Sequence, residues 1–208
     1  MVSNDYLKPT FFIDYNSPKI KELAQELSNG VEDKREIAKN IFSCVRDTIN
    51  YTIESFQYDN QEGYKASSTL SAKRGWCIPK SILSVALMRA NGIPARLHFA
   101  DIINHRSPKY LHDLMGTNVF YFHGYFEIYL EDKWIKLTPS FETSLCERHN
   151  FPICEFDGKN DAIFKPIDNL GQPFVEYIKD RGVYADLPFQ EMLDTFLANY
   201  GRDLHYQS

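Results

Sequence analysis

The stretch Arg74-Gly75-Trp76-Cys77-Ile78-Pro79 is followed by an apolar run that ends at Asn91-Gly92-Ile93-Pro94-Ala95-Arg96. This run predicts a helix that begins at Cys77. Pro79 suits the first turn of a helix, Gly92 suits the residue after its end, and Pro94 prevents continuation. Few polar residues interrupt the run, so we expect the helix to be buried on most sides and to hold Cys77 rigidly.

Cys77 therefore lies at the positive end of the predicted helix. First-turn amides have no acceptors within a helix, and the helix dipole adds partial positive charge there. Both effects favour a thiolate, so we expect a lowered pKa and a nucleophilic sulfur near neutral pH. The alternative is a structural thiol, because unpaired cysteines are often buried.

Along residues 119–130, phenylalanine and aliphatic side chains alternate with side chains that are mostly polar or tyrosine. This pattern predicts a β-strand with one face on the core. His123 lies on the other face, which is polar and aromatic, where we expect it to be accessible. Residues 131–133 read as a turn and residues 134–138 as the returning strand. A histidine that follows a helix-starting cysteine is a candidate general base.

Together these segments resemble the core of the transglutaminase-like superfamily. There the first block reads roughly G-x-C, a helix, and L-x-R-A-x-G-I-P-A-R, and it matches Gly75-x-Cys77 and residues 87–96. The second block reads H-A-W-V-E-V-Y, then G-x-W and D-P-T. It matches residues 123–129, Lys133-Trp134 and Thr138-Pro139-Ser140. The resemblance covers about residues 65–142.

The resemblance implies an α+β fold with a papain-like, transglutaminase-like core. In it a central cysteine-bearing helix packs on an antiparallel sheet. We expect N-terminal helices before this core and a C-terminal helical extension after it. Residues 1–208 are expected to form a single domain, with the core at about 32–142 and the extension at about 143–208.

The resemblance also implies a Cys-His-Asp triad that acts on acyl groups, by hydrolysis or by transfer to an amine. The matching positions of this chain imply that Cys77 is the nucleophile and that His123 acts first as the general base and later as the general acid. The backbone amide of Cys77 would stabilise the oxyanion. A second donor is expected from the preceding loop, around Ser67-Ser68-Thr69.

The third triad position departs from the family, because Thr138 stands where the aspartate is expected. A threonine hydroxyl can orient an imidazole but supplies no charge. Two carboxylates are alternatives. A two-residue turn at Asp132-Lys133 would put Glu142 opposite His123 and Glu127 opposite Thr138, and Asp157 lies in a turn-like segment. Surface charge is the plain interpretation of Glu142 and Asp157.

Composition limits the function. The 208 residues carry a net charge of −5 and no basic run, so we expect no nucleic-acid partner. No apolar stretch approaches a membrane span, and the first thirty residues lack a secretory leader pattern. We therefore expect a cytoplasmic protein without a membrane partner, with its four cysteines reduced.

Further elements follow from sequence periodicity. Helices are predicted from Ser17 to about Asn29 and from Glu32 to Tyr51, the second with Cys44 in its apolar stripe. Residues 55–68 and 101–118 read as loops, the latter as either a lid or a surface crossover. Two closing helices are predicted at 174–181 and 188–200.

A metal site is the rival interpretation of Cys146-x-x-His149 with Cys154 nearby. A fourth ligand and a second paired spacing are missing, so we expect no metal and no cofactor.

Two classes of function stay open. One is a cysteine-dependent enzyme that acts on a peptide or small amide, as an amidase or peptidase or as a transglutaminase-type amine acyltransferase. The other is a weakened or inactive binding or scaffold protein that kept the fold. Tyr121, Tyr125 and Tyr129 form either an aromatic cleft wall or an ordinary strand surface.

Overall fold

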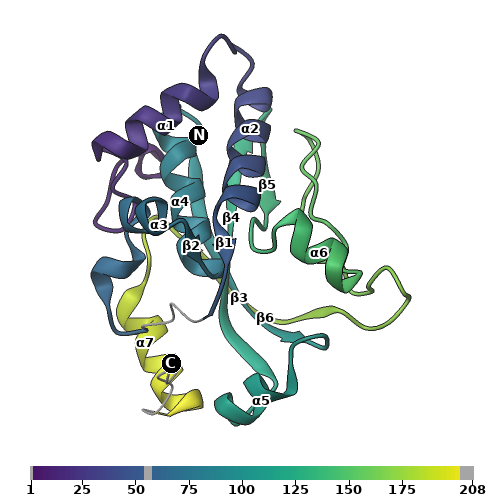
Figure 1. The fold of residues 1–208 in the computed structure, drawn as a ribbon. Coiled ribbons are helices and arrows are strands. Elements are labelled where there is room, and N and C mark those ends of the chain that lie inside the picture. Colours follow the sequence, from purple (N-terminus) through teal and green to yellow (C-terminus); the bar gives the residue numbers. More distant parts are fainter. Residues whose placement is uncertain (1, 54–57, 202–208) are drawn as a thin grey trace.

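The structure is a computed structural model that describes residues 2–53 and 58–201. A four-stranded antiparallel sheet is covered by helices (Figure 1), which confirms the predicted α+β fold. Its strand order is β5–β4–β3–β6. The strands are β3 (Ala95–Asn104), β4 (Val119–Leu130), β5 (Lys133–Leu137) and β6 (Val175–Tyr184).

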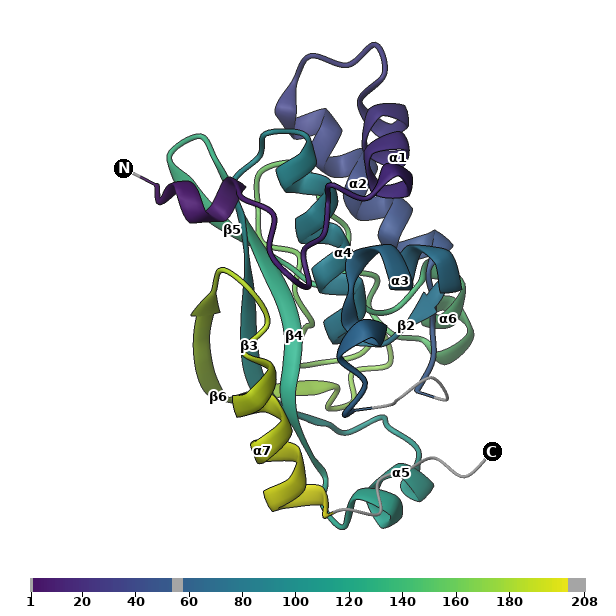
Figure 2. The same ribbon diagram turned by 90° about the vertical axis from the view of Figure 1, so that its left-hand side faces the viewer.

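The central helix is α4 (Cys77–Ala90), and it begins at the predicted cysteine. It packs on β3 and β4, and the helices α1 (Pro18–Ser28), α2 (Lys34–Thr48) and α3 (Ala66–Ala72) surround it (Figure 2). Ile78 to Arg89 are all buried. At the far end Gly92 adopts φ +66° and Ile93 N donates to Met88 O, so the predicted stop at Gly92 is confirmed.

A buried lysine joins α4 to α2. Lys80 Nζ donates to the carbonyl oxygens of Arg46 (3.0 Å) and Ile49 (2.5 Å), at the end of α2. Carbonyls in the last turn of a helix lack partners within it, and the ammonium group supplies one. Burial lowers the pKa of Lys80 to about 7, because a desolvated ammonium is disfavoured.

A buried arginine fixes the other end of α4. The Arg89 guanidinium donates to the backbone oxygens of Ala95 (2.9 Å), Lys8 (2.7 Å) and Ala185 (2.7 Å). One side chain therefore joins the N-terminal segment, the start of β3 and the segment before the last helix.

The segment that leads into Cys77 is also held in place. Strands β1 (Asn50–Tyr51) and β2 (Arg74–Gly75) form a short parallel pair directly after α2 and directly before Trp76. The β1–β2 pair therefore holds the segment before Cys77, and the buried helix α4 holds the residues after it.

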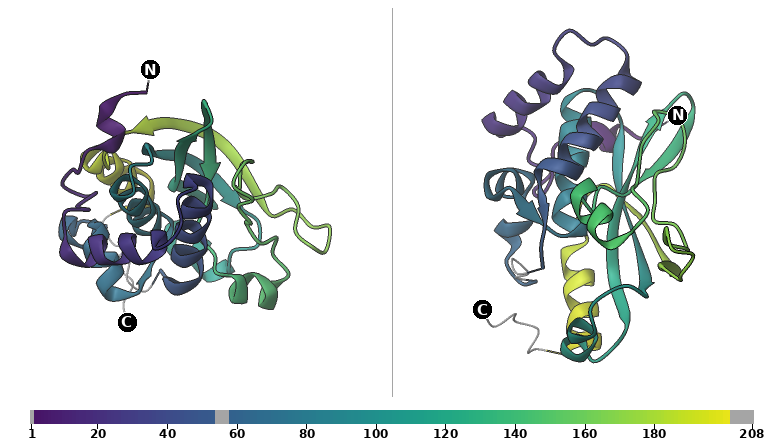
Figure 3. Two further views of the ribbon diagram at one scale, coloured as in Figure 1. Left: turned by 90° about the horizontal axis from the view of Figure 1, so that it is seen from above. Right: turned by 45° about the vertical axis from the view of Figure 1, so that its right-hand side comes forward.

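The C-terminal part departs from the prediction. The predicted helix at 174–181 is wrong, because this segment forms β6 at the edge of the sheet, antiparallel to β3. The extension is therefore not entirely helical. The last predicted helix is confirmed as α7 (Phe189–Tyr200). Helix α6 (Thr143–His149) packs near the end of α2 (Figure 3).

The two predicted loops contain short helices. Residues 55–68 include the 3₁₀ helix η2 (Gln61–Tyr64) and the start of α3, although residues 54–57 lie outside the described part. Residues 101–118 include the end of β3 and helix α5 (Lys109–Met115). A further 3₁₀ helix, η1 (Asn4–Leu7), lies near the N-terminus. No helix of the described residues is long and apolar enough to cross a membrane.

The β4–β5 hairpin has a different register from the predicted one. Its two turn residues are Glu131 and Asp132, with φ of 48° and 61°, and Leu130 pairs with Lys133. Glu127 is therefore opposite Lys136 instead of Thr138. The ladder ends at Leu137, so Glu142 does not lie opposite His123.

Gly124 lets β4 touch the first turn of α4. A Cβ atom at this position would lie 3.0 Å from both Cα and Cγ1 of Ile78, closer than van der Waals contact permits. The absence of a side chain therefore allows the backbone of β4 to approach Cys77.

We predict that Gly124→Ala lowers the free energy of unfolding by about 1–3 kcal/mol, because the added methyl group overpacks this contact. Urea denaturation measures the change. The control is Gly63→Ala, whose Cβ would meet the Asn60 side chain at 3.4 Å, an ordinary distance. Equal losses in both variants would contradict the role given to the Gly124–Ile78 contact.

Candidate functional site

Cys77 lies where three backbone amides converge. Trp76 precedes α4 without a side-chain cap, and the backbone amides of Cys77 and Ile78 act to lower the pKa of the Cys77 thiol. The third comes from Gly124 on β4. Pro79 has no amide, and Lys80 N already donates to Trp76 O, so the thiol receives the free donors of this helix end.

The electrostatic balance at Cys77 differs from the prediction. Burial raises the pKa of the thiol to about 11, and the three amides only partly oppose this effect. The pKa of Cys77 is therefore raised in this structure, and the expected lowered pKa is wrong. The donors are in place, but the dry surroundings disfavour a free thiolate.

His123 is in a similar position. The side chain lies on the predicted strand but is only 4% exposed, so the expected accessible face is wrong. Its ring packs among those of Phe164 (5.3 Å between centroids), Tyr125 (6.1 Å) and Tyr177 (6.1 Å). Burial lowers the pKa of His123 to about 3, which leaves the imidazole neutral.

A bulge in β4 interrupts the alternation directly before His123. Phe122 adopts φ +55°, and its amide donates to Asp101 Oδ1 at 3.1 Å. The register between β3 and β4 shifts by one residue there. Bulges redirect side chains near binding sites, and this one lies directly before His123.

Cys77 and His123 border the same cavity, whose volume is about 120 Å³. Its walls come from the start of α4, the ends of β3 and β4, α5, α7 and the segment after β5. No local pattern predicts α5 and α7 as walls, because both are distant from Cys77 in the chain. The residues that they supply are Leu111, Leu114, Met115, Phe196 and Tyr200.

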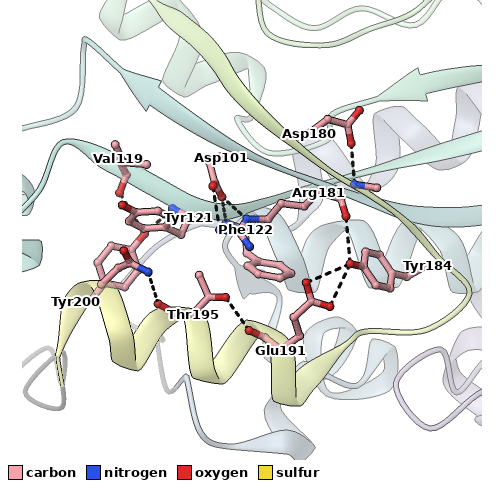
Figure 4. Close-up of polar contacts among 12 residues, drawn as sticks. Asp101, Val119, Tyr121, Phe122, Asp180, Arg181, Tyr184, Glu191, Thr195 and Tyr200 are labelled. Carbon is pink, nitrogen blue, oxygen red and sulfur yellow. Dashed lines mark hydrogen bonds and ion pairs between the residues drawn. The ribbon is translucent and has the colours of Figure 1, made fainter.

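Helix α7 is fastened to the sheet beside this cavity (Figure 4). The Tyr200 hydroxyl accepts from Tyr121 N at 2.6 Å and donates to Val119 O at 3.3 Å. At the other end of α7, the Tyr184 hydroxyl donates to Glu191 Oε2 at 3.1 Å. These bonds hold the aromatic residues of α7 against the cavity.

Thr138 is 1% exposed and directly follows β5. Its amide donates to Ala162 O at 2.8 Å, and its hydroxyl lies near that of Tyr177, which also packs on His123. No regular hydrogen bond joins the two hydroxyls. Among the described residues, both Thr138 Oγ1 and His123 Nε2 lack a hydrogen-bond partner.

The two alternative carboxylates are used elsewhere. Glu142 Oε2 accepts from Tyr51 N at 3.1 Å. Asp157 accepts from the amides of Lys159 (2.8 Å) and Asn160 (2.7 Å), and these bonds lower its pKa to about 2. Asp157 therefore caps its own exposed turn.

Two further carboxylates bind another histidine, which the sequence reasoning missed. His98 lies between Glu127 Oε1 at Nδ1 (2.8 Å) and Asp180 Oδ1 at Nε2 (2.9 Å). Tyr125 stacks between the rings of His98 and His123. The sequence feature that could have predicted this cluster is a second histidine, His98, in the segment that forms β3 and pairs with β4.

Three other expectations concern the surroundings of the site. Ser67, Ser68 and Thr69 lie within α3 and do not line the cavity, so a second oxyanion donor from a loop there is wrong. Cys44 is only partly buried instead of filling the core. No group of three or more candidate ligands in residues 2–53 and 58–201 could hold a metal ion, Cys146 and His149 included.

The sequence profile of the Transglutaminase-like superfamily matches residues 21–139, which include Cys77, His123 and Thr138. The chain belongs to this superfamily. No curated protein matches the sequence.

A solved structure described as "a Putative Cysteine Protease from Cytophaga hutchinsonii" is similar to this chain, with a TM-score of 0.50 and 18% sequence identity. The similarity covers 88% of this chain and 55% of the other, so this chain spans about half of that protein's length. At this identity the likeness shows the shared fold.

The buried His123 predicts a specific dependence of stability on pH. The unfolded chain binds a proton near pH 6.5, whereas the folded protein does so only near pH 3. The free energy of unfolding should therefore fall with decreasing pH between these values, by up to about 1.4 kcal/mol per pH unit from this group. His123→Gln removes the titration, so its slope between pH 6 and pH 4 should be smaller. Identical slopes in urea denaturation would show that His123 is hydrated.

Proposed function

We propose that this protein is a cysteine-dependent acyl-transfer enzyme that acts on amide bonds, with Cys77 as nucleophile and His123 as general base and acid. The observation that carries the proposal is that a thiol at three converging amides and an imidazole border one cavity. A substrate in this cavity can reach both groups. Membership of the transglutaminase-like superfamily supports the same chemistry.

The charge state of the resting site shapes the mechanism. Both groups are neutral, so the Cys77 thiol passes its proton to His123 as the sulfur attacks the substrate carbonyl. The carbonyl oxygen gains negative charge, and the amide of Cys77 stabilises it. His123 then protonates the leaving amine, the C–N bond breaks, and a thioester stays on Cys77.

The second half of the reaction determines the class of enzyme. If water attacks the thioester, the protein is an amidase or peptidase; if an amine attacks, it is an acyltransferase. Both routes use the same two residues and the same peptide or small amide as acyl donor.

The second candidate is a binding protein that retained the fold with weakened chemistry. It is favoured by one observation: no carboxylate of the described residues contacts His123, while Thr138 stands at the third position. Formation of a thioester distinguishes the two candidates.

We predict that 4-nitrophenyl acetate acetylates Cys77 and that Cys77→Ala abolishes this reaction. His123→Gln should slow it at least roughly 10-fold, because the proton acceptor is lost. Peptide mass spectrometry locates the acetyl group, and the melting temperature of each variant controls for folding. Hydroxylamine in the assay converts the thioester to a hydroxamate and so measures transfer against hydrolysis. Equal labelling of Cys77 and Cys44 would contradict the proposal.

We predict that Thr138→Asp raises the acetylation rate and that Thr138→Val lowers it. The carboxylate would stabilise the imidazolium, and valine would remove the Thr138 hydroxyl from the third position. Loss of one orienting contact costs roughly 1–3 kcal/mol, or about one to two decades in rate. Asp157→Asn is the control, because Asp157 caps an exposed turn. No change in either Thr138 variant would exclude Thr138 as the orienting residue.

A further inference from the structure

The cavity beside Cys77 is unusual for its lack of charge. Of the 19 lining residues in the described part of the chain, none is an aspartate, glutamate, lysine or arginine, and fifteen are aliphatic or aromatic, three of these being tyrosines. The imidazole of His123 is neutral because burial lowers its pKa. A ligand that enters the cavity therefore loses its hydrating water and contacts mostly apolar side chains.

Burial of a charge or an unpaired amide in such a wall is costly. A carboxylate or ammonium group on the substrate would find no counter-charge among the described lining residues, and a primary amide would find few partners. Asn104 and Ser140 are polar lining residues, and Ser140 is buried. It is 1% exposed, and its hydroxyl has no hydrogen-bond partner among the described residues.

The size of the cavity limits what it holds. Its volume of about 120 Å³ is somewhat smaller than the cavity of about 150 Å³ that binds benzene in an engineered protein. A phenyl ring or a branched chain of four or five carbons is therefore near the upper limit.

The rim of the cavity is apolar as well. Leu114 of α5 lines the cavity and is 41% exposed. Leu114 is therefore an exposed apolar side chain at the mouth of an apolar cavity. Such a side chain can contact an apolar group of the substrate as that group enters.

From these observations we infer that Cys77 takes its acyl group from an uncharged donor that carries a phenyl or branched aliphatic side chain. This inference rests on the proposed function, because it specifies the acyl group that Cys77 receives. The described wall disfavours charged acyl groups, and a phenyl ring or a short branched chain is the size that its volume of about 120 Å³ fits.

The test uses four 4-nitrophenyl esters: acetate, 3-methylbutanoate, phenylacetate and succinate. In each reaction the Cys77 sulfur bonds to the acyl carbon, the ester C–O bond breaks, 4-nitrophenolate leaves, and the thiol proton passes to His123. The rate of each ester is divided by its rate with N-acetylcysteine, which removes intrinsic reactivity. Mass spectrometry confirms that Cys77 carries the acyl group.

We expect the normalised rates of the 3-methylbutanoyl and phenylacetyl esters to exceed that of the acetyl ester about 10-fold or more, as burial of their carbons implies. The succinyl ester should be the slowest. Leu114→Glu should reduce the advantage of the apolar esters by placing a charge at the rim. The control Leu170→Glu adds the same charge at another exposed leucine (58%) that does not line the cavity, and should leave all four rates unchanged.

Two results would overturn the inference, and they differ in what else they overturn. If all four esters acylate Cys77 with equal normalised rates, the apolar pocket does not select the acyl group, but the nucleophile stands. If no ester acylates Cys77, the proposed function fails and the inference fails with it.

Discussion

The close contact between Gly124 and Ile78 is the constraint on which the site depends. Because position 124 has no side chain, β4 lies directly on the first turn of α4 and adds a third amide to the two that already act to lower the pKa of the Cys77 thiol. The same contact fixes the next residue back along the strand, His123, at the edge of the cavity. The positions of Cys77 and His123, which lie more than forty residues apart in sequence, thus depend on the absence of a side chain at position 124.

Burial sets the charge state of the site. It disfavours the charged form of both Cys77 and His123, so the resting pair is neutral, and in the proposed mechanism charge arises only when a substrate carbonyl is attacked. The amides at the thiol are then aligned before charge develops. An apolar cavity strengthens such dipoles, because there is little water to screen them. In the proposed mechanism the resting thiol is therefore a weak nucleophile, but the amides beside it stabilise the charge that develops during the reaction.

The sequence predicted the parts of the fold that have strong local signals. Pro79 and Gly92 bracket α4, and the alternation of residues 119–130 gave β4 its bounds. The hairpin register was not predictable in the same way, because Glu131 and Asp132 adopt positive φ without a glycine to mark the turn. The segment 175–184 carries a β-rich sequence that a helical reading overlooked, and the free edge of β3 decides its structure. The cavity walls from α5 and α7 are tertiary features with no local signature.

The clamp formed by Arg89 has a consequence for how the protein is made. Its guanidinium bonds to Lys8, Ala95 and Ala185, so it is complete only after the chain has been synthesised beyond residue 185. Helix α7 emerges from the ribosome after every other wall of the cavity and brings Phe196 and Tyr200. Until α7 is in place, the cavity beside Cys77 lacks the walls that Phe196 and Tyr200 supply.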